Sequence, residues 1–283
     1  QGQAKRQEEP GLPRPGEALL RIKDPIIIIE ITAIRFMTDW IAPDMYEKVA
    51  RSIDAYYADC VITQFYFAYE DHQNASQYLL NRDYYSREEL ERDVFPTMLY
   101  TGKWYQFGIF PNCWTKVFKA DILRKHIFDV DDRIRLGEDI AFTYPCLLDC
   151  QSLSFIDEPL YYYRQNPASM TASYDVRLPN IYWLPYQALV KASDNLGEYL
   201  SNQLSYYLLY LVNFVIRNEA AAHTGNNVNL VIHNVISENS LSFGNIIDLT
   251  SLPWHIRILY TALKRKSVVL LKLYYVVMKT HLR

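Results

Sequence analysis

The stretch that decides the fold class is WIAPDMYEKVARSIDAYYADCVITQFYF, residues 40–67. Pro43 and Asp44 indicate a helix start, because proline suits the first turn of a helix and a carboxylate suits its positive end. Apolar residues then recur at helical spacing, at Met45, Val49, Ile53 and Tyr56. The run over 60–67 is a candidate strand. A helix followed by a strand is typical of α/β domains, so this stretch predicts an α/β fold.

The composition of the 283-residue chain is that of a folded protein. Half of the residues are apolar and 14% are aromatic, which is ample for a packed core and excludes global disorder. The net charge of -3 is close to neutral, so bulk charge gives no reason to expect nucleic-acid binding.

The cysteines are Cys60, Cys113, Cys146 and Cys150, and no two of them form a CxxC pair. A zinc site or a thioredoxin-like motif is therefore not expected. For Cys146 and Cys150, which share a predicted helix, we expect free, buried thiols in a reducing cytoplasm.

The two ends of the chain differ from its middle. Residues 1–25 mix charge, proline and glycine without periodicity, and are predicted to be disordered or misread. Residues 26–172 are predicted to form the α/β domain, beginning with a strand over 26–29, and residues 173–283 a helical region. Because the chain begins at Gln1 rather than methionine, we expect it to be a fragment.

Between the ends, capping residues and periodicity indicate further elements. A capping-box pattern at Ser86–Glu89 predicts a helix start. The predicted elements are a helix from this start towards Met98, a helix over 119–124, short strands over 153–156 and 160–163, and helices over 186–211 and 213–222.

The segment GEDIAF, residues 137–142, places Glu138 and Asp139 at the start of a predicted helix. A carboxylate at the mouth of a cleft can act as general base towards an attacking hydroxyl, a contribution of roughly 100- to 10,000-fold. The alternative is structural, because the helix dipole favours acids at this position by a few tenths of a kcal/mol. The same dipole lowers a carboxyl pKa and weakens the base, unless burial or a neighbouring acid offsets it.

Two further motifs also have two interpretations. In PNCWTKVFKADIL, residues 111–123, Trp114 and Lys116 line a sugar site, or they are a core tryptophan and a solvated lysine. In EPLYYYRQNPASMT, residues 158–171, Arg164 binds a phosphate through forked hydrogen bonds, or it is a surface ion-pair partner.

The tail is basic: after Asp248 there is no acidic residue, and the cations are Arg257, Lys264, Arg265, Lys266, Lys272, Lys279 and Arg283. Its apolar run over 267–278 is shorter than the roughly 20 residues that span a bilayer. We expect either a basic amphipathic helix on an anionic membrane or a helix packed on the domain with a solvated basic face.

In their order, these motifs resemble the back half of bacterial family 2 glycosyltransferases, which build capsule, exopolysaccharide and lipopolysaccharide chains. The resemblance covers residues 39–172 and implies a GT-A fold, a Rossmann-like α/β domain, here partial and followed by a helical region. It is carried by WIAPDMYEKV, ADCVITQFYF, PNCWTKVFKADIL, GEDIAFTYPCLLDC and FIDEPLYYYRQNPASMT.

The resemblance assigns roles to individual residues. Asp139 corresponds to the catalytic base and Glu138 to its neighbour. Arg164 and Gln165 fall in a segment that closes on donor and acceptor. Trp114 and Lys116 lie in a substrate-binding segment that is usually NKLY-like and here reads NCWTK.

The resemblance also implies a Mg or Mn ion, held on the donor diphosphate by a DxD-type segment. That segment falls on residues 36–40, where only Asp39 and Trp40 match. Phe36 stands at an acid position and cannot ligate a hard cation. The nucleotide-binding front half is missing or garbled, and we expect the first 38 residues to be a frame-shifted or misassembled reading of it.

The implied activity is inverting transfer of a sugar from a nucleotide-sugar donor, expected to be a UDP-sugar, to a hydroxyl of a growing polysaccharide or lipid-linked acceptor. The expected place is the cytoplasmic face of the cell membrane, bound peripherally through the basic tail. The alternative is a non-catalytic remnant, or an acceptor-binding, membrane-docked partner that lacks the metal and nucleotide site.

Overall fold

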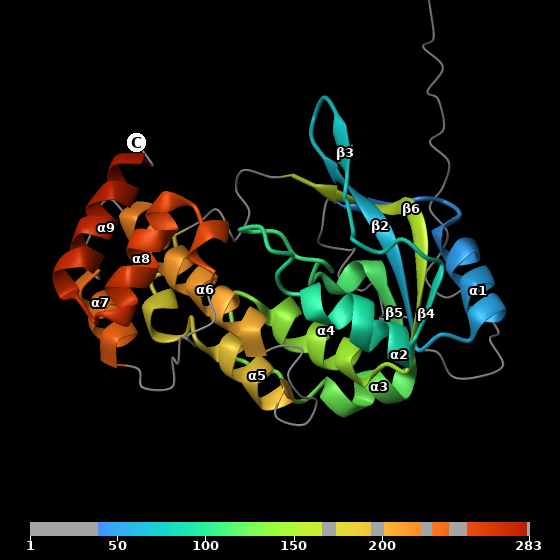
Figure 1. Cartoon of the computed structure of the whole chain (residues 1–283). Helices are drawn as coiled ribbons and strands as arrows, with labels where there is room; N and C mark the ends of the chain where they lie inside the picture. The colour runs from blue at the N-terminus through green and yellow to red at the C-terminus, as the bar shows by residue number, and fades with distance from the viewer. Residues whose placement is uncertain (1–38, 166–173, 194–200, 222–227, 238–247, 282–283) are drawn as a thin grey trace, which may run out of the picture.

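The computed structural model describes residues 39–165, 174–193, 201–221, 228–237 and 248–281. The segment predicted to be disordered or misread and the strand predicted over 26–29 lie outside these residues. Figure 1 shows a twisted sheet flanked by helices at one end of the molecule and a group of helices, α6 to α9, at the other.

The sheet is built on two parallel strands, β2 (Cys60–Ala68) and β6 (Ser152–Arg164). Within the described residues it has six strands, with the order β1-β6-β2-β3 along its main path. The outer strands all pair antiparallel: β1 (Trp40–Ile41) and β4 (Tyr84–Ser86) with β6, and β3 (Gln73–Ala75) and β5 (Lys116–Phe118) with β2.

The two short strands predicted over 153–156 and 160–163 are one continuous strand, β6. Thr63 pairs with Ile156 but the next residue, Gln64, pairs with Pro159, so the intervening acids form an irregularity in β6. These acids, Asp157 and Glu158, are exposed, and a bulge accommodates Pro159, which has no N–H to donate. Local polarity therefore suggested a break where the strand only bulges.

Helix α1 (Met45–Tyr56) packs on one face of the sheet, as the apolar spacing predicts. Met45, Val49 and Ile53 are buried in a cluster with residues of β2 and β6. Tyr56, predicted on the same face, is instead exposed and stacks on Tyr84, with 5.5 Å between ring centroids.

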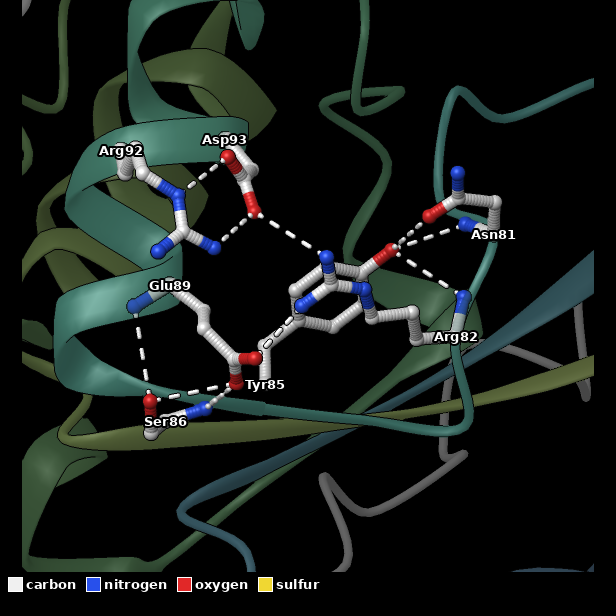
Figure 2. Close-up of polar contacts among 7 residues, drawn as sticks. All are labelled: Asn81, Arg82, Tyr85, Ser86, Glu89, Arg92 and Asp93. Carbon is white, nitrogen blue, oxygen red and sulfur yellow. Dashed lines mark hydrogen bonds and ion pairs between the residues drawn. The ribbon is translucent and has the colours of Figure 1, made fainter.

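The predicted capping box is confirmed at the start of α2 (Arg87–Glu89). The Ser86 main-chain N–H donates to the Glu89 carboxylate at 2.9 Å, and the Glu89 N–H donates to the Ser86 hydroxyl at 3.4 Å (Figure 2). The helical path continues through a π turn, Leu90–Val94, and a 3-10 turn, Phe95–Thr97, towards Met98 as predicted. Arg82 pairs with Glu89 and so joins the preceding loop to the helix.

Helices α3 (Ala120–His126) and α4 (Glu138–Asp149) cover the other face of the sheet, together with α2. The apolar side chains of Ile140, Tyr144, Leu147 and Leu148 in α4 are buried, and the Tyr144 hydroxyl donates to the Ile109 carbonyl at 2.7 Å. Cys146 and Cys150 are free and buried, as expected.

The helical region comprises α5 (Leu184–Ser193), α6 (Ser201–Ala221), α7 (Val228–Ser237), α8 (Trp254–Lys264) and α9 (Val268–His281). The predicted break between 211 and 213 is wrong, because α6 runs through Asn213. The Asn213 side chain is buried and accepts a hydrogen bond from the Tyr274 hydroxyl of α9 at 2.7 Å. A polar residue that suggested a boundary thus joins two helices.

One apolar cluster runs from the sheet through α4 into α6, α8 and α9, so the α/β part and the helical region share a core. The predicted α/β class with a helical C-terminal region is confirmed. Among the helices of the described ranges, none combines the length and the apolar character needed to cross a membrane.

Two glycines with positive φ test the packing at the start of α4. A Cβ on Gly137 (φ 82) would lie 2.8 Å from the Tyr207 hydroxyl of α6, whereas a Cβ on Gly102 (φ 91) would meet nothing within 4 Å. We expect Gly102→Ala to lower the free energy of unfolding by about 1–2 kcal/mol through backbone strain alone. Gly137→Ala should lower it further because of the clash. Urea unfolding measures both, and equal losses would contradict the close approach of α4 and α6.

Candidate active site

Glu138 and Asp139 occupy the first turn of α4, which has no side-chain cap. Asp139 is half-buried and Glu138 is exposed beside it. The Cys113 thiol donates a hydrogen bond to Asp139 Oδ1 at 3.1 Å, and its sulfur lies 3.4 Å from the Thr143 hydroxyl oxygen. Cys113 opens a 3-10 turn, Cys113–Thr115, and sequence reasoning missed it. Its only signal was its place beside Trp114 in the NCWTK segment.

Burial decides the electrostatics of the two acids. It raises the pKa of Asp139 above its ordinary value, against the opposing effects of the Cys113 hydrogen bond and the positive charge of Lys116. The Glu138 side chain keeps contact with solvent but is partly desolvated by its neighbours, which raises its pKa, and the charge of Asp139 adds to the shift. Burial thus shifts both carboxyl groups in the direction that a general base requires.

A cavity of about 800 Å³ opens beside these acids, and both of them line it. Its volume lies in the range of roughly 300–1,000 Å³ that is typical of small-molecule sites. The walls come from the start of α4, from the segment 174–178 and from α6. The residues of α6 in the wall are Tyr207, Tyr210, Leu211 and Phe214.

Three other predicted residues gather at the end of the sheet. Asp39 accepts hydrogen bonds from the Tyr161 hydroxyl at 3.0 Å and from the Arg164 main-chain N–H at 2.9 Å. Trp114 stacks on Tyr161 and on Tyr163, with ring centroids 4.1 Å and 5.3 Å apart. The tyrosine pair thus connects Asp39, Arg164 and Trp114.

The pKa of Tyr163 is affected both by Asp39 of this group and by Asp139 of α4. Burial raises its pKa, and the charges of Asp39 and Asp139 both add to the shift. The Gln165 main-chain N–H donates to the Ala68 carbonyl at 2.8 Å, which fixes the chain at the end of β6. Of the seven predicted site residues, only Glu138 and Asp139 line the cavity; Asp39, Trp114, Lys116, Arg164 and Gln165 lie outside its wall.

Lys116 is neither a solvated lysine nor part of the cavity wall. It is buried, and its ammonium donates to the carbonyls of Phe110 and Asn112, both at 2.7 Å, and to the Thr115 hydroxyl at 3.3 Å. Burial lowers its pKa to about 8. An ammonium has three donors, and all three face protein oxygens, so Lys116 fixes the turn that carries Cys113 and Trp114.

Asp39 and the other described residues do not provide a ligand set for a Mg or Mn ion. Both oxygens of Asp39 already accept hydrogen bonds from protein donors. Within the described ranges, no three His, Cys, Asp or Glu side chains converge as a metal site. Hard cations take several oxygen ligands, so Asp39 alone does not make a metal centre.

No protein-family model matches the chain. The chain is 24% identical over 176 residues to the glycosyltransferase GlyA of Streptococcus pneumoniae serotype 4. It is 23% identical over 177 residues to EpsH of Bacillus subtilis, which its name assigns to the glycosyltransferases. These matches cover 60% and 61% of this chain but 24% of GlyA and 49% of EpsH. The chain thus spans about a quarter and about half the length of these curated relatives.

The fold is similar to the crystal structure of S. aureus TarS 1-349 in complex with UDP-GlcNAc. The TM-score is 0.51 at 14% sequence identity, and the match covers 86% of this chain and 65% of that chain. In sequence the chain is similar to glycosyltransferases, and in fold to TarS.

The pKa of Asp139 tests this geometry without any substrate. We expect its carboxyl group to titrate above the ordinary 3.8, because burial disfavours the charged form. Cys113→Ala should raise the pKa further, since it removes a hydrogen bond that favours the carboxylate. A ¹³C NMR titration of carboxyl-labelled protein measures both, with Asp139→Asn to assign the signal. Thr143→Val is the control, and a pKa unchanged by Cys113→Ala would refute the hydrogen bond.

Proposed function

We propose that the chain is part of an inverting glycosyltransferase of the family 2 type, with Asp139 as catalytic base. The observation that carries the proposal is a half-buried carboxylate of raised pKa that lines a cavity of about 800 Å³. The similarity to GlyA and EpsH supports sugar transfer as the reaction class. The family and the inverting course rest on the order of the motifs.

In this reaction, a hydroxyl of a growing surface polysaccharide or glycolipid attacks the anomeric carbon of a nucleotide-sugar. Asp139 removes the proton of that hydroxyl, and the nucleoside diphosphate leaves from the opposite side of the carbon. A raised pKa makes Asp139 a stronger base at neutral pH than an ordinary aspartate. Glu138, exposed beside it, accepts a hydrogen bond from a second acceptor hydroxyl.

The donor is proposed to be a UDP-sugar, because the similar fold of TarS was crystallised with UDP-GlcNAc. Trp114, Arg164 and Gln165 are proposed to bind it from the end of the sheet, beside Asp39. A Mg or Mn ion would need ligands beyond the described residues, so no step here depends on one.

The second candidate is a non-catalytic, acceptor-binding partner, which the missing metal ligands among the described residues favour. Titration of the chain with UDP-N-acetylglucosamine and UDP-glucose, with and without Mn²⁺, separates the two functions. Micromolar binding supports the transferase, and no binding of either donor leaves the acceptor-binding function.

Asp139→Asn should abolish transfer and leave UDP-sugar binding unchanged. It should also raise the free energy of unfolding at neutral pH. A raised carboxyl pKa means that the folded state holds the proton more tightly, so stability falls as pH rises from the ordinary pKa through the shifted one. Product analysis, donor titration and urea unfolding check the three outcomes. Retained turnover would exclude Asp139 as the base.

We further propose that α8 and α9 hold the protein peripherally on the cytoplasmic face of the membrane. The inner face of α9 packs in the core through Leu271 and Tyr274. Its outer face exposes Val269, Leu273 and Val276, with exposed Lys272 among them. An apolar face with basic residues beside it suits an anionic bilayer surface.

Sedimentation with lipid vesicles tests the membrane proposal. We expect binding to phosphatidylglycerol vesicles and not to phosphatidylcholine vesicles. Leu273→Asp should weaken binding at least about tenfold, because burying one leucine is worth roughly 1.5–3 kcal/mol. Leu230→Asp, at an exposed leucine of α7, is the matched control. Equal effects of the two variants would exclude α9 as the docking face.

A further inference from the structure

The cavity at Asp139 does not end at the first turn of α4. A second cavity of about 560 Å³ adjoins it, and the two share Arg135, Val176 and Arg177 in their walls. The second cavity is otherwise lined by Asp132, Arg133, Asn180 and Ile181. Because three residues line both, the two cavities are neighbours, one at Asp139 and the other beyond the arginines, and we refer to the pair as the groove.

The lining of the groove suits a sugar ring. Tyr210 and Phe214 of α6 and Phe107 present aromatic surface in the first cavity. Charged groups of both signs, among them Glu138 and Arg135, stand beside these rings. A sugar offers an apolar C–H face for an aromatic ring and hydroxyls that both donate and accept, so it uses both kinds of surface.

The charges favour an uncharged ligand. Of the two shared arginines, Arg177 already pairs with Asp175 at 2.7 Å, and Arg133 of the second cavity pairs with Asp131 at 2.6 Å. Arg135 is exposed and has no ion-pair partner within the described ranges. Against this one cation stand Glu138 and Asp139, so the groove has no excess of positive charge for a phosphate.

The segment 174–181, which contributes lining residues to both cavities, is fixed to the helical region. The Asp175 N–H donates to the Asn218 side-chain oxygen of α6, and the Asn218 amide donates back to the Asp175 carbonyl, both at 3.0 Å. The Asn234 amide of α7 donates to the Pro179 carbonyl at 2.7 Å. A wall held in place before binding costs less ordering entropy when a ligand enters.

We propose that this groove holds the growing end of an extended, uncharged saccharide chain. The terminal sugar lies in the first cavity with its attacking hydroxyl at Asp139. The preceding sugar passes Arg135 into the second cavity. This inference rests on the proposed transferase function and adds the length and charge of the acceptor.

Ligand-observed NMR titration of the whole chain tests the inference. The probes are glucose, galactose and N-acetylglucosamine, their β-linked di- and trisaccharides, and glucose 1-phosphate. We expect at least one series to bind at millimolar concentration or below, with a gain of about tenfold from mono- to disaccharide, or about 1.4 kcal/mol. No binding by any series, equal affinity at all lengths, or tighter binding of glucose 1-phosphate than of glucose would overturn the proposal.

Variants locate the binding. Arg135→Gln should remove the gain from the second sugar and leave monosaccharide affinity unchanged, whereas Tyr210→Ala should weaken every length. Arg124→Gln, an exposed arginine of α3 that lines neither cavity, is the control for the lost charge. Circular dichroism melts confirm that each variant folds. If the Arg135→Gln and Arg124→Gln variants bind disaccharides with equal affinity, the proposal that the second sugar contacts Arg135 is wrong.

Different results would exclude the proposed transferase function and the proposed saccharide groove. Saccharide binding with the expected length dependence, without UDP-sugar binding, supports the groove and removes the transferase. UDP-sugar binding without saccharide binding keeps the transferase and removes the groove.

Discussion

The site depends on the tight packing around Gly137 at the start of α4, where Tyr207 of α6 and Pro185 of α5 leave no room for a side chain. Gly137 has a left-handed backbone conformation and no side chain, so the Tyr207 hydroxyl can approach it closely. A Cβ at this position would lie only 2.8 Å from that hydroxyl. This contact sets the first turn of α4 against a helix of the C-terminal region, so that Glu138 and Asp139 line a cavity with walls from both parts. Without it, the acids would stand at an ordinary solvated helix start, where the dipole would lower the pKa of Asp139.

Opposing effects on the pKa of Asp139 show why its position at a helix start does not by itself determine how strong a base it is. The hydrogen bonds from Cys113 favour the charged carboxylate, and so does the buried ammonium of Lys116. Burial acts in the opposite direction and is the larger effect. Lys116 contributes a long-range charge while its donors hold the neighbouring turn, a role different from the substrate contact that its motif suggests.

Elements encoded by neighbouring residues could be predicted from the sequence. The α1–β2 unit, the Ser86 capping box and the start of α4 follow from local spacing and capping chemistry, and each is present. Features that depend on distant partners could not be predicted. Polar residues at 157–158 and at Asn213 suggested breaks, but a neighbouring strand and Tyr274 accommodate them. The hydrogen bond from Cys113 and the wall from α6 join segments far apart in the chain, so no local pattern revealed them.

The shared core has an evolutionary consequence. Helix α6 faces the groove with Tyr210 and Phe214 while neighbouring residues of the same helix are buried in the common core and against the start of α4. If the chain is the transferase proposed above, a change in α6 that admits a bulkier acceptor would also alter how much water reaches Asp139, the proposed base. Acceptor specificity and the basicity of Asp139 would then be tied to one helix, and a homologue with a new acceptor would have to readjust the pKa of its base at the same time.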